Sequence, residues 1–211
     1  YRRSTQATVY DYDVRRNYLK PLSDAPGKQM IPTFSPDGRM CAYVKDNNIW
    51  IRKFDYDTEI QITKDGKQNA ILNGITDWVY EEEFSVTNLM AWSPDSKVLA
   101  FVRSDESEVP EYSMQVYGDG LYPGYYNFKY PKAGEKNSTV SVMAYNVESK
   151  DTKKLDIPMD ADGYIPRITF TTKPEQLAVM TLNRQQNRFN MFYTNPKSGV
   201  SKLILKEENK C

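Results

Sequence analysis

One pattern recurs three times along the chain, and it constrains the fold more than any other feature of the sequence. Each copy begins with an aromatic residue, continues through a short turn, and carries an alanine eight residues later, inside an apolar segment. The copies span residues 34–44, 92–102 and 170–180, and the third is the weakest. Their starting points lie 58 and 78 residues apart. This is longer than the ~40–50 residues of compact propeller repeats and predicts insertions between copies.

The rest of the chain has the composition and periodicity of strands. It contains 16 Tyr, 8 Phe and 3 Trp, and aromatic side chains favour strands because they pack well on a pleated surface. No long segment shows the 3.6-residue period of a helix, so the sequence predicts an all-β fold. Further strand-like segments precede the first copy or follow each copy: two within 8–22, then 49–54, 59–63, 141–146, 152–155, 191–194 and 200–205.

Aromatic residue, turn, strand, hairpin and strand is the order of a four-stranded propeller blade. The alternative is a β-sandwich whose hairpins resemble one another by chance. The constant spacing from the aromatic residue to Ala42, Ala100 and Ala178 favours the propeller. Three to four blades are few for a closed ring, since propellers typically have ~4–8. We therefore expect a partial β-propeller that belongs to a larger ring.

The composition excludes several classes of function for this chain alone. Histidine is absent, which removes Ser-His-Asp and Cys-His catalysis and His-ligated zinc. Two cysteines, Cys41 and Cys211, cannot form a disulfide framework or a four-thiolate metal site. The 28 basic residues match the 28 acidic ones, so the basic excess of a nucleic-acid-binding surface is missing. We expect no cofactor and no nucleic-acid partner. Because the chain opens with Tyr1, we interpret it as a segment of a longer protein.

One segment, residues 73–84, does not follow the blade pattern. It lies between the last strand of one predicted blade and the aromatic residue of the next, and it carries three consecutive glutamates beside aromatic residues. Carboxylates next to aromatic bulk are costly to bury unless a cation pairs with them. No Lys or Arg occurs between Lys67 and Lys97, so the cation would be a distant side chain or a ligand amine. The alternative is a solvated acidic turn.

The segment Asn-Gly-Ile-Thr-Asp-Trp-Val-Tyr-Glu-Glu-Glu, residues 73–83, resembles the glutamate motif of the dipeptidyl peptidase IV family. These serine peptidases are related to prolyl oligopeptidase and have an N-terminal propeller and a C-terminal α/β-hydrolase domain. Other motifs follow in the family's order, and the resemblance is dense up to about residue 145. They are Tyr-Arg-Arg-Ser at 1–4, Tyr-Asp-Tyr-Asp at 10–13, Trp-Ser-Pro-Asp at 92–95, Glu-Val-Pro at 108–110, Glu-Tyr-Ser at 111–113 and Tyr-Pro-Lys-Ala-Gly at 130–134.

The resemblance implies an eight-bladed propeller, of which residues 1–211 form part. It also implies that Glu81 and Glu82 hold the free N-terminal amine of a peptide substrate, with a supporting role for Glu83. Arg2 matches the family arginine that contacts the carbonyl of the penultimate substrate residue, and a shift of one residue would give that role to Arg3. Two residues then fit between this stop and a serine nucleophile, so dipeptides are removed after Pro or Ala.

The catalytic part that the family requires is absent from this chain. The sequence has no Gly-x-Ser-x-Gly elbow and no alternation of strands and helices, so we expect the segment alone to hydrolyse nothing. The implied partners are peptides with a free N-terminus and an α/β-hydrolase domain of the same protein. The family's dimers leave a homodimer open, and its members act in the periplasm or otherwise outside the cytoplasm.

Two other readings of function stay open at this point. One is a propeller without a working nucleophile in its parent protein, serving only as a scaffold for protein or peptide binding. The other is a sandwich with an acidic calcium patch, which adjacent glutamates disfavour because calcium loops use spaced oxygen ligands. Two further segments favour structural roles: 117–131, rich in Tyr, Gly and Pro, as an ordered excursion, and 105–108 as a solvated loop.

Overall fold

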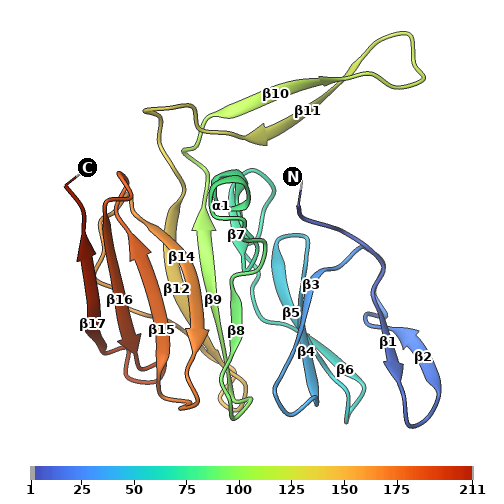
Figure 1. The fold of residues 1–211 in the computed structure, drawn as a ribbon. Coiled ribbons are helices and arrows are strands. Elements are labelled where there is room, and N and C mark those ends of the chain that lie inside the picture. Colours follow the sequence, from blue (N-terminus) through green and yellow to red (C-terminus); the bar gives the residue numbers. More distant parts are fainter. Residues whose placement is uncertain (1–2, 211) are drawn as a thin grey trace.

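The computed structural model describes residues 3–210 and is built almost entirely from antiparallel strands. Three sheets stand side by side along the molecule (Figure 1). The first sheet contains β3 (Met30–Phe34), β4 (Met40–Lys45), β5 (Asn48–Lys53) and β6 (Thr58–Gln61). The third contains β14 (Tyr164–Phe170), β15 (Leu177–Leu182), β16 (Arg188–Thr194) and β17 (Ser201–Glu208). Both are four-stranded blades in sequence order, as the repeat predicted.

The second sheet has the same order of strands but carries two insertions, one within its first strand (residues 74–89) and one between its second and third strands. Its strands are β7 (Ile71–Asn73), β8 (Met90–Trp92), β9 (Val98–Asp105), β12 (Thr139–Asn146) and β13 (Thr152–Lys154). A hairpin of β10 (Glu111–Val116) and β11 (Gly124–Lys129) is inserted between β9 and β12 and extends away from the sheets as an arm (Figure 1). A separate hairpin, β1 (Tyr10–Asp13) with β2 (Tyr18–Pro21), precedes the first sheet. The insertions account for the long offsets between the repeats.

The three repeats fold in the same way, which explains why their spacing is constant. In each one the residue after the aromatic, Ser35, Ser93 or Thr171, donates its backbone N–H to the carbonyl five residues later. These bonds measure 2.9, 2.8 and 3.0 Å. Each turn leads from the first strand of a sheet into the second, where the repeated alanine lies buried. The prediction of an all-β partial propeller is therefore confirmed.

The apolar core lies between neighbouring sheets. Side chains of the first and second sheets form one cluster, and side chains of the second and third sheets form another. The alanines of the repeat are 0% to 5% exposed, and their small side chains let adjacent sheets approach closely. Cys41 is fully buried in β4, as expected of a small apolar residue, and burial raises its pKa to about 12. Cys211 lies outside the described residues.

Within residues 3–210, no helix is both long and apolar enough to cross a bilayer. The structure has one α-helix, α1 (Trp78–Glu83), in the part of the chain described. The segment 105–108 differs from the expected solvated loop, because Glu106 is only 2% exposed. The arm packs several of its own rings, as an ordered excursion does: Tyr126 stacks on Phe128 with centroids 5.6 Å apart, and Phe128 packs edge-on against Tyr130 at 6.4 Å. Tyr117 and Tyr122 are exposed.

Candidate functional site: an acidic helix inside a split strand

The acidic segment interrupts the first strand of the second sheet instead of simply connecting two blades. β7 and β8 both pair with β9, and the chain leaves the sheet after Asn73 and returns at Met90. Backbone bonds close the gap at its base: Gly74 N–H donates to Val102 at 2.9 Å, and Leu89 N–H donates to Gly74 at 2.8 Å. The segment is therefore a loop whose two ends are fixed to one point of the sheet.

Gly74 is required at the start of this loop for two reasons. Its φ of +75° lies in the left-handed region that residues with a Cβ rarely adopt. A Cβ added there would also lie 2.7 Å from Cγ of Met90, so both the backbone and the packing select glycine.

Helix α1 begins at a buried aspartate. Asp77 is the N-cap, and its Oδ1 accepts the Tyr80 N–H at 3.0 Å, which satisfies one of the unpaired donors of the first turn. Its Oδ2 accepts a 2.6 Å hydrogen bond from the Ser138 hydroxyl, which comes from the residue before β12. Burial raises the pKa of Asp77, and these hydrogen bonds oppose that shift. The cap thus fixes the helix to its own sheet.

Tyr80 fixes the same helix to the next sheet. Its side chain is buried, and its hydroxyl oxygen accepts the backbone N–H of Ile165 in β14 at 2.7 Å. Burial raises the pKa of this hydroxyl well above its ordinary value, so it stays protonated. Phe84 and Tyr164 complete an aromatic cluster in which neighbouring ring centroids lie 5.2 to 6.1 Å apart.

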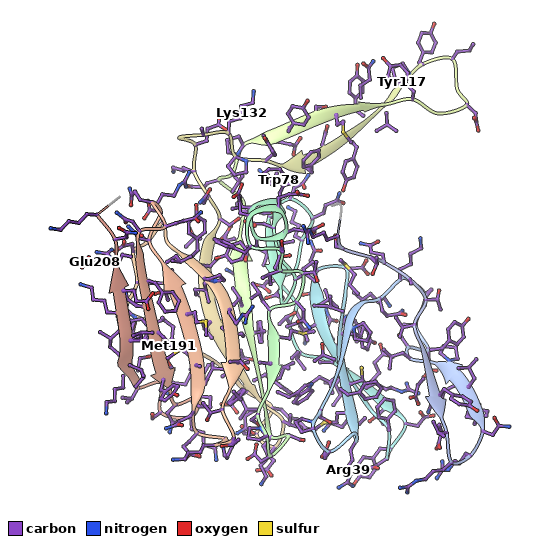
Figure 2. All side chains as sticks on the ribbon, in the orientation of Figure 1. Arg39, Trp78, Tyr117, Lys132, Met191 and Glu208 are labelled. Atoms are coloured by element: carbon purple, nitrogen blue, oxygen red, sulfur yellow. The ribbon has the colours of Figure 1, made fainter. Side chains whose placement is uncertain are left out.

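Trp78 connects the helix to the base of the arm. Its ring packs edge-on against Tyr130, with centroids 4.4 Å apart. Figure 2 shows Trp78 at the junction between the sheets and the arm, while Tyr117 lies near the arm's far end. Helix α1 is therefore attached to its own sheet, to the next sheet and to the arm by residues other than its glutamates.

The three glutamates differ sharply in their surroundings. Glu81 is 0% exposed, and its Oε1 accepts backbone N–H groups from Arg3 and from Ser4, the latter at 3.0 Å. Its Oε2 is enclosed and has no hydrogen-bond partner within the described range 3–210. Glu82 is half-buried and Glu83 is exposed. Neighbouring positions on one short helix thus offer one enclosed and two accessible carboxylates.

The N-terminal residues that the resemblance singled out are described only in part. Arg2 lies outside the described residues. Arg3 is exposed, and its backbone is bonded to Glu81 although 77 residues separate the two. The structure thus brings residues 3 and 4 to the acidic helix.

Sequence reasoning did not identify Glu106 or the pairing of Asp77 with Ser138. Glu106 follows β9, and burial together with the Asp77 charge raises its pKa to about 7. Its Oε2 has no hydrogen-bond partner in the described part of the chain. The side chain lines a cavity of about 620 Å³ between the first two sheets, the N-terminal segment and the arm. Nothing in the sequence distinguishes Glu106 from the neighbouring acids, because its burial depends on contacts between distant segments.

Among residues 3–210, no group of three or more Cys, Asp or Glu side chains has the geometry of a metal site.

Comparison with known proteins agrees with this architecture. The family model described as the dipeptidyl peptidase IV (DPP IV) N-terminal region matches residues 1–211. A probable dipeptidyl-aminopeptidase B of Emericella nidulans is 34% identical over 221 residues, covering 97% of this chain and 24% of that protein. The mouse prolyl endopeptidase FAP is 36% identical over 194 residues, covering 89% of this chain and 25% of that protein.

A crystal structure of Porphyromonas gingivalis dipeptidyl peptidase 4 is 67% identical in sequence and superposes with a TM-score of 0.98. The match covers 100% of this chain and 30% of that one. A putative dipeptidyl aminopeptidase IV from Bacteroides ovatus, 23% identical with a TM-score of 0.77, shares the fold. The chain spans about a quarter of the length of the curated relatives it matches. With its whole length matched by the family model, this chain belongs to the dipeptidyl peptidase IV N-terminal region family.

Proposed function

We propose that this chain is the substrate-anchoring part of a dipeptidyl peptidase IV-like serine exopeptidase, which removes N-terminal dipeptides after Pro or Ala. In this proposal the acids of α1 bind the free amine of the peptide, and Arg2 contacts the substrate backbone. A hydrolase domain of the same protein supplies the nucleophile, and two copies of that protein can form a homodimer. The observation that carries the proposal is an acidic helix held rigidly at one point of a family propeller.

The electrostatics of α1 support binding of a cation. A helix has a partial negative charge at its C-terminal end, and the last turn of α1 contains carboxylates and no basic residue. The α-amine of a peptide has a pKa near ~8 and is mostly protonated at neutral pH. A protonated amine placed there forms charge-assisted hydrogen bonds, which are stronger than neutral ones.

The three acids have unequal roles in this proposal. The sequence predicted Glu81 and Glu82 as the pair that contacts the amine. Because Glu82 and Glu83 are the glutamates that reach solvent, we assign direct contact to Glu82 with Glu83 beside it. Glu81 is enclosed and already accepts two N–H groups, so it contributes indirectly.

The rigid attachment of α1 supports its use as a molecular stop. A carboxylate that binds the substrate amine at a fixed distance from the nucleophile limits how many substrate residues fit between the amine and the cleaved bond. Room for two residues corresponds to release of a dipeptide. A peptide with an acylated N-terminus would leave the carboxylates without their cationic partner, and sites of this kind reject such ligands strongly.

The test is release of a chromophore from a Gly-Pro amide by the full-length protein, with the N-acetylated amide beside it. We expect turnover of the free amine only, and a loss of about 10- to 100-fold in kcat/KM for Glu82→Gln, since a charged partner is lost. Equal turnover of the acetylated substrate would contradict the amine anchor. A full-length protein inactive on both substrates would favour the binding scaffold.

A further inference from the structure

Glu81 joins two parts of the chain that are far apart in sequence. One of its carboxylate oxygens accepts the N–H groups of two consecutive residues, Arg3 and Ser4. The carboxylate itself belongs to α1, whose position is fixed by Asp77 and Tyr80. The bond therefore transmits the position of the helix to the N-terminal segment.

Two features make this contact stronger than a surface hydrogen bond. The Glu81 side chain is 0% exposed, and a hydrogen bond in such surroundings is electrostatically stronger than one in water. Both donors are backbone groups, so the contact fixes the path of the chain and not merely one side chain. Within the described residues, the segment 3–6 belongs to no strand or helix, so no regular backbone pairing holds it in place.

We propose that Glu81 is a positioning residue that fixes the backbone of residues 3–4 against α1, next to the glutamates proposed to bind the substrate amine. The inference rests on the proposed function and assigns to Glu81 a task different from that of Glu82. Glu81 binds the protein's own amides, and Glu82 binds the amine of the substrate. The Oε1 of Glu81 already accepts two donors, and its Oε2 is enclosed, so a ligand would have to displace protein atoms to reach either oxygen.

The two roles make opposite demands on charge. A ligand for a protonated amine needs a negative charge, so replacement by glutamine weakens it strongly. A positioning carboxylate needs an acceptor oxygen, which glutamine retains. Glu81→Gln is therefore the informative variant, with Glu82→Gln as its matched control. Glu81→Met removes the acceptor while keeping the length and most of the volume of the side chain.

The experiment measures two quantities on the full-length protein and its variants. The first is kcat and KM for a Gly-Pro chromogenic amide. The second is hydrogen exchange of the amides of residues 3 and 4, which does not depend on activity. We expect Glu81→Gln to keep amide protection and lose less than about tenfold in kcat/KM, because a neutral acceptor remains. We expect Glu81→Met to lose protection and to raise KM while kcat changes little.

Two outcomes would overturn the positioning role. One is amide protection that is unchanged in Glu81→Met, since the bonds would then not hold this segment. The other is a Glu81→Gln variant as impaired as Glu82→Gln with its amides still protected, since Glu81 would then be a direct ligand. Full activity of Glu82→Gln would contradict the proposed function instead, and the exchange measurement would still decide the role of Glu81. Should Glu81→Met not fold, Glu81→Gln decides through the same two readouts.

Discussion

The hydroxyl oxygen of Tyr80 accepts the backbone N–H of Ile165 at 2.7 Å, and this bond joins two neighbouring sheets across 85 residues of sequence. Tyr80 belongs to the acidic helix, while Ile165 belongs to the first strand of the third sheet. Both residues are buried, so water cannot replace either partner. The position of the acidic helix therefore depends on correct packing of the following blade.

Tyr80→Phe is expected to destabilise the chain by about 1–3 kcal/mol, because it leaves the Ile165 N–H buried without an acceptor. Urea unfolding followed by tryptophan fluorescence measures the change. Tyr145→Phe is the matched control, since Tyr145 is buried but its hydroxyl has no hydrogen-bond partner in the described part of the chain. We expect less than about 0.5 kcal/mol for this control. Equal effects of the two substitutions would mean that the bond to Ile165 contributes nothing.

Gly74→Ala is expected to destabilise the chain by about 2–3 kcal/mol. The substitution places a Cβ on a backbone with left-handed φ, and this Cβ clashes with the Met90 side chain. Gly38 provides the comparison, because its φ is +70° and a Cβ there meets no atom within 4 Å. Gly38→Ala should therefore show the backbone strain alone, about 1 kcal/mol. The difference between the two variants in urea unfolding isolates the clash. No difference would mean that Met90 moves aside freely.

Glu106→Gln is expected to change the pH dependence of stability. The pKa of Glu106 is raised to about 7 by burial, by Asp77 and by Asp105, with Lys129 opposing. The folded state therefore keeps a proton that the unfolded state has already lost, and this residue makes stability fall as pH rises from about 4.5 to about 7. Each pKa unit corresponds to about 1.4 kcal/mol, so the whole contribution is on the order of 3 kcal/mol.

Glutamine does not titrate, so the variant should lose this decrease and be the more stable protein at pH 8. Urea unfolding at pH 5, 6, 7 and 8 measures both slopes. Glu108→Gln is the control, because Glu108 is exposed and forms an ion pair with Lys136 at the surface. Parallel pH profiles for Glu106→Gln and the unmodified chain would contradict a raised pKa.

The strands and the site were predictable from sequence to different degrees. The eight-residue spacing from aromatic residue to alanine, as from Trp92 to Ala100, recurs in all three copies and predicts a turn between two paired strands. This turn could be predicted because it depends only on residues close together in sequence. The splitting of the first strand into β7 and β8 depends on which residues pair with β9, and pairing partners are not local. The burial of Glu81 and Glu106 has the same origin. Identical side chains at positions 81–83 differ only in what distant segments place around them.

Arg2 and Arg3 are neighbours, and only one of them is proposed to contact the substrate. Arg3 contributes a backbone N–H to Glu81, and alanine has the same N–H, so Arg3→Ala should change kcat/KM of the full-length protein by less than about threefold. Arg2→Ala should cost about 10- to 100-fold, because the proposed contact between its guanidinium and the substrate carbonyl is lost. Steady-state kinetics on a Gly-Pro amide measures both. The reverse order would assign the substrate contact to Arg3, and Glu81 would then hold the backbone of the contacting residue itself.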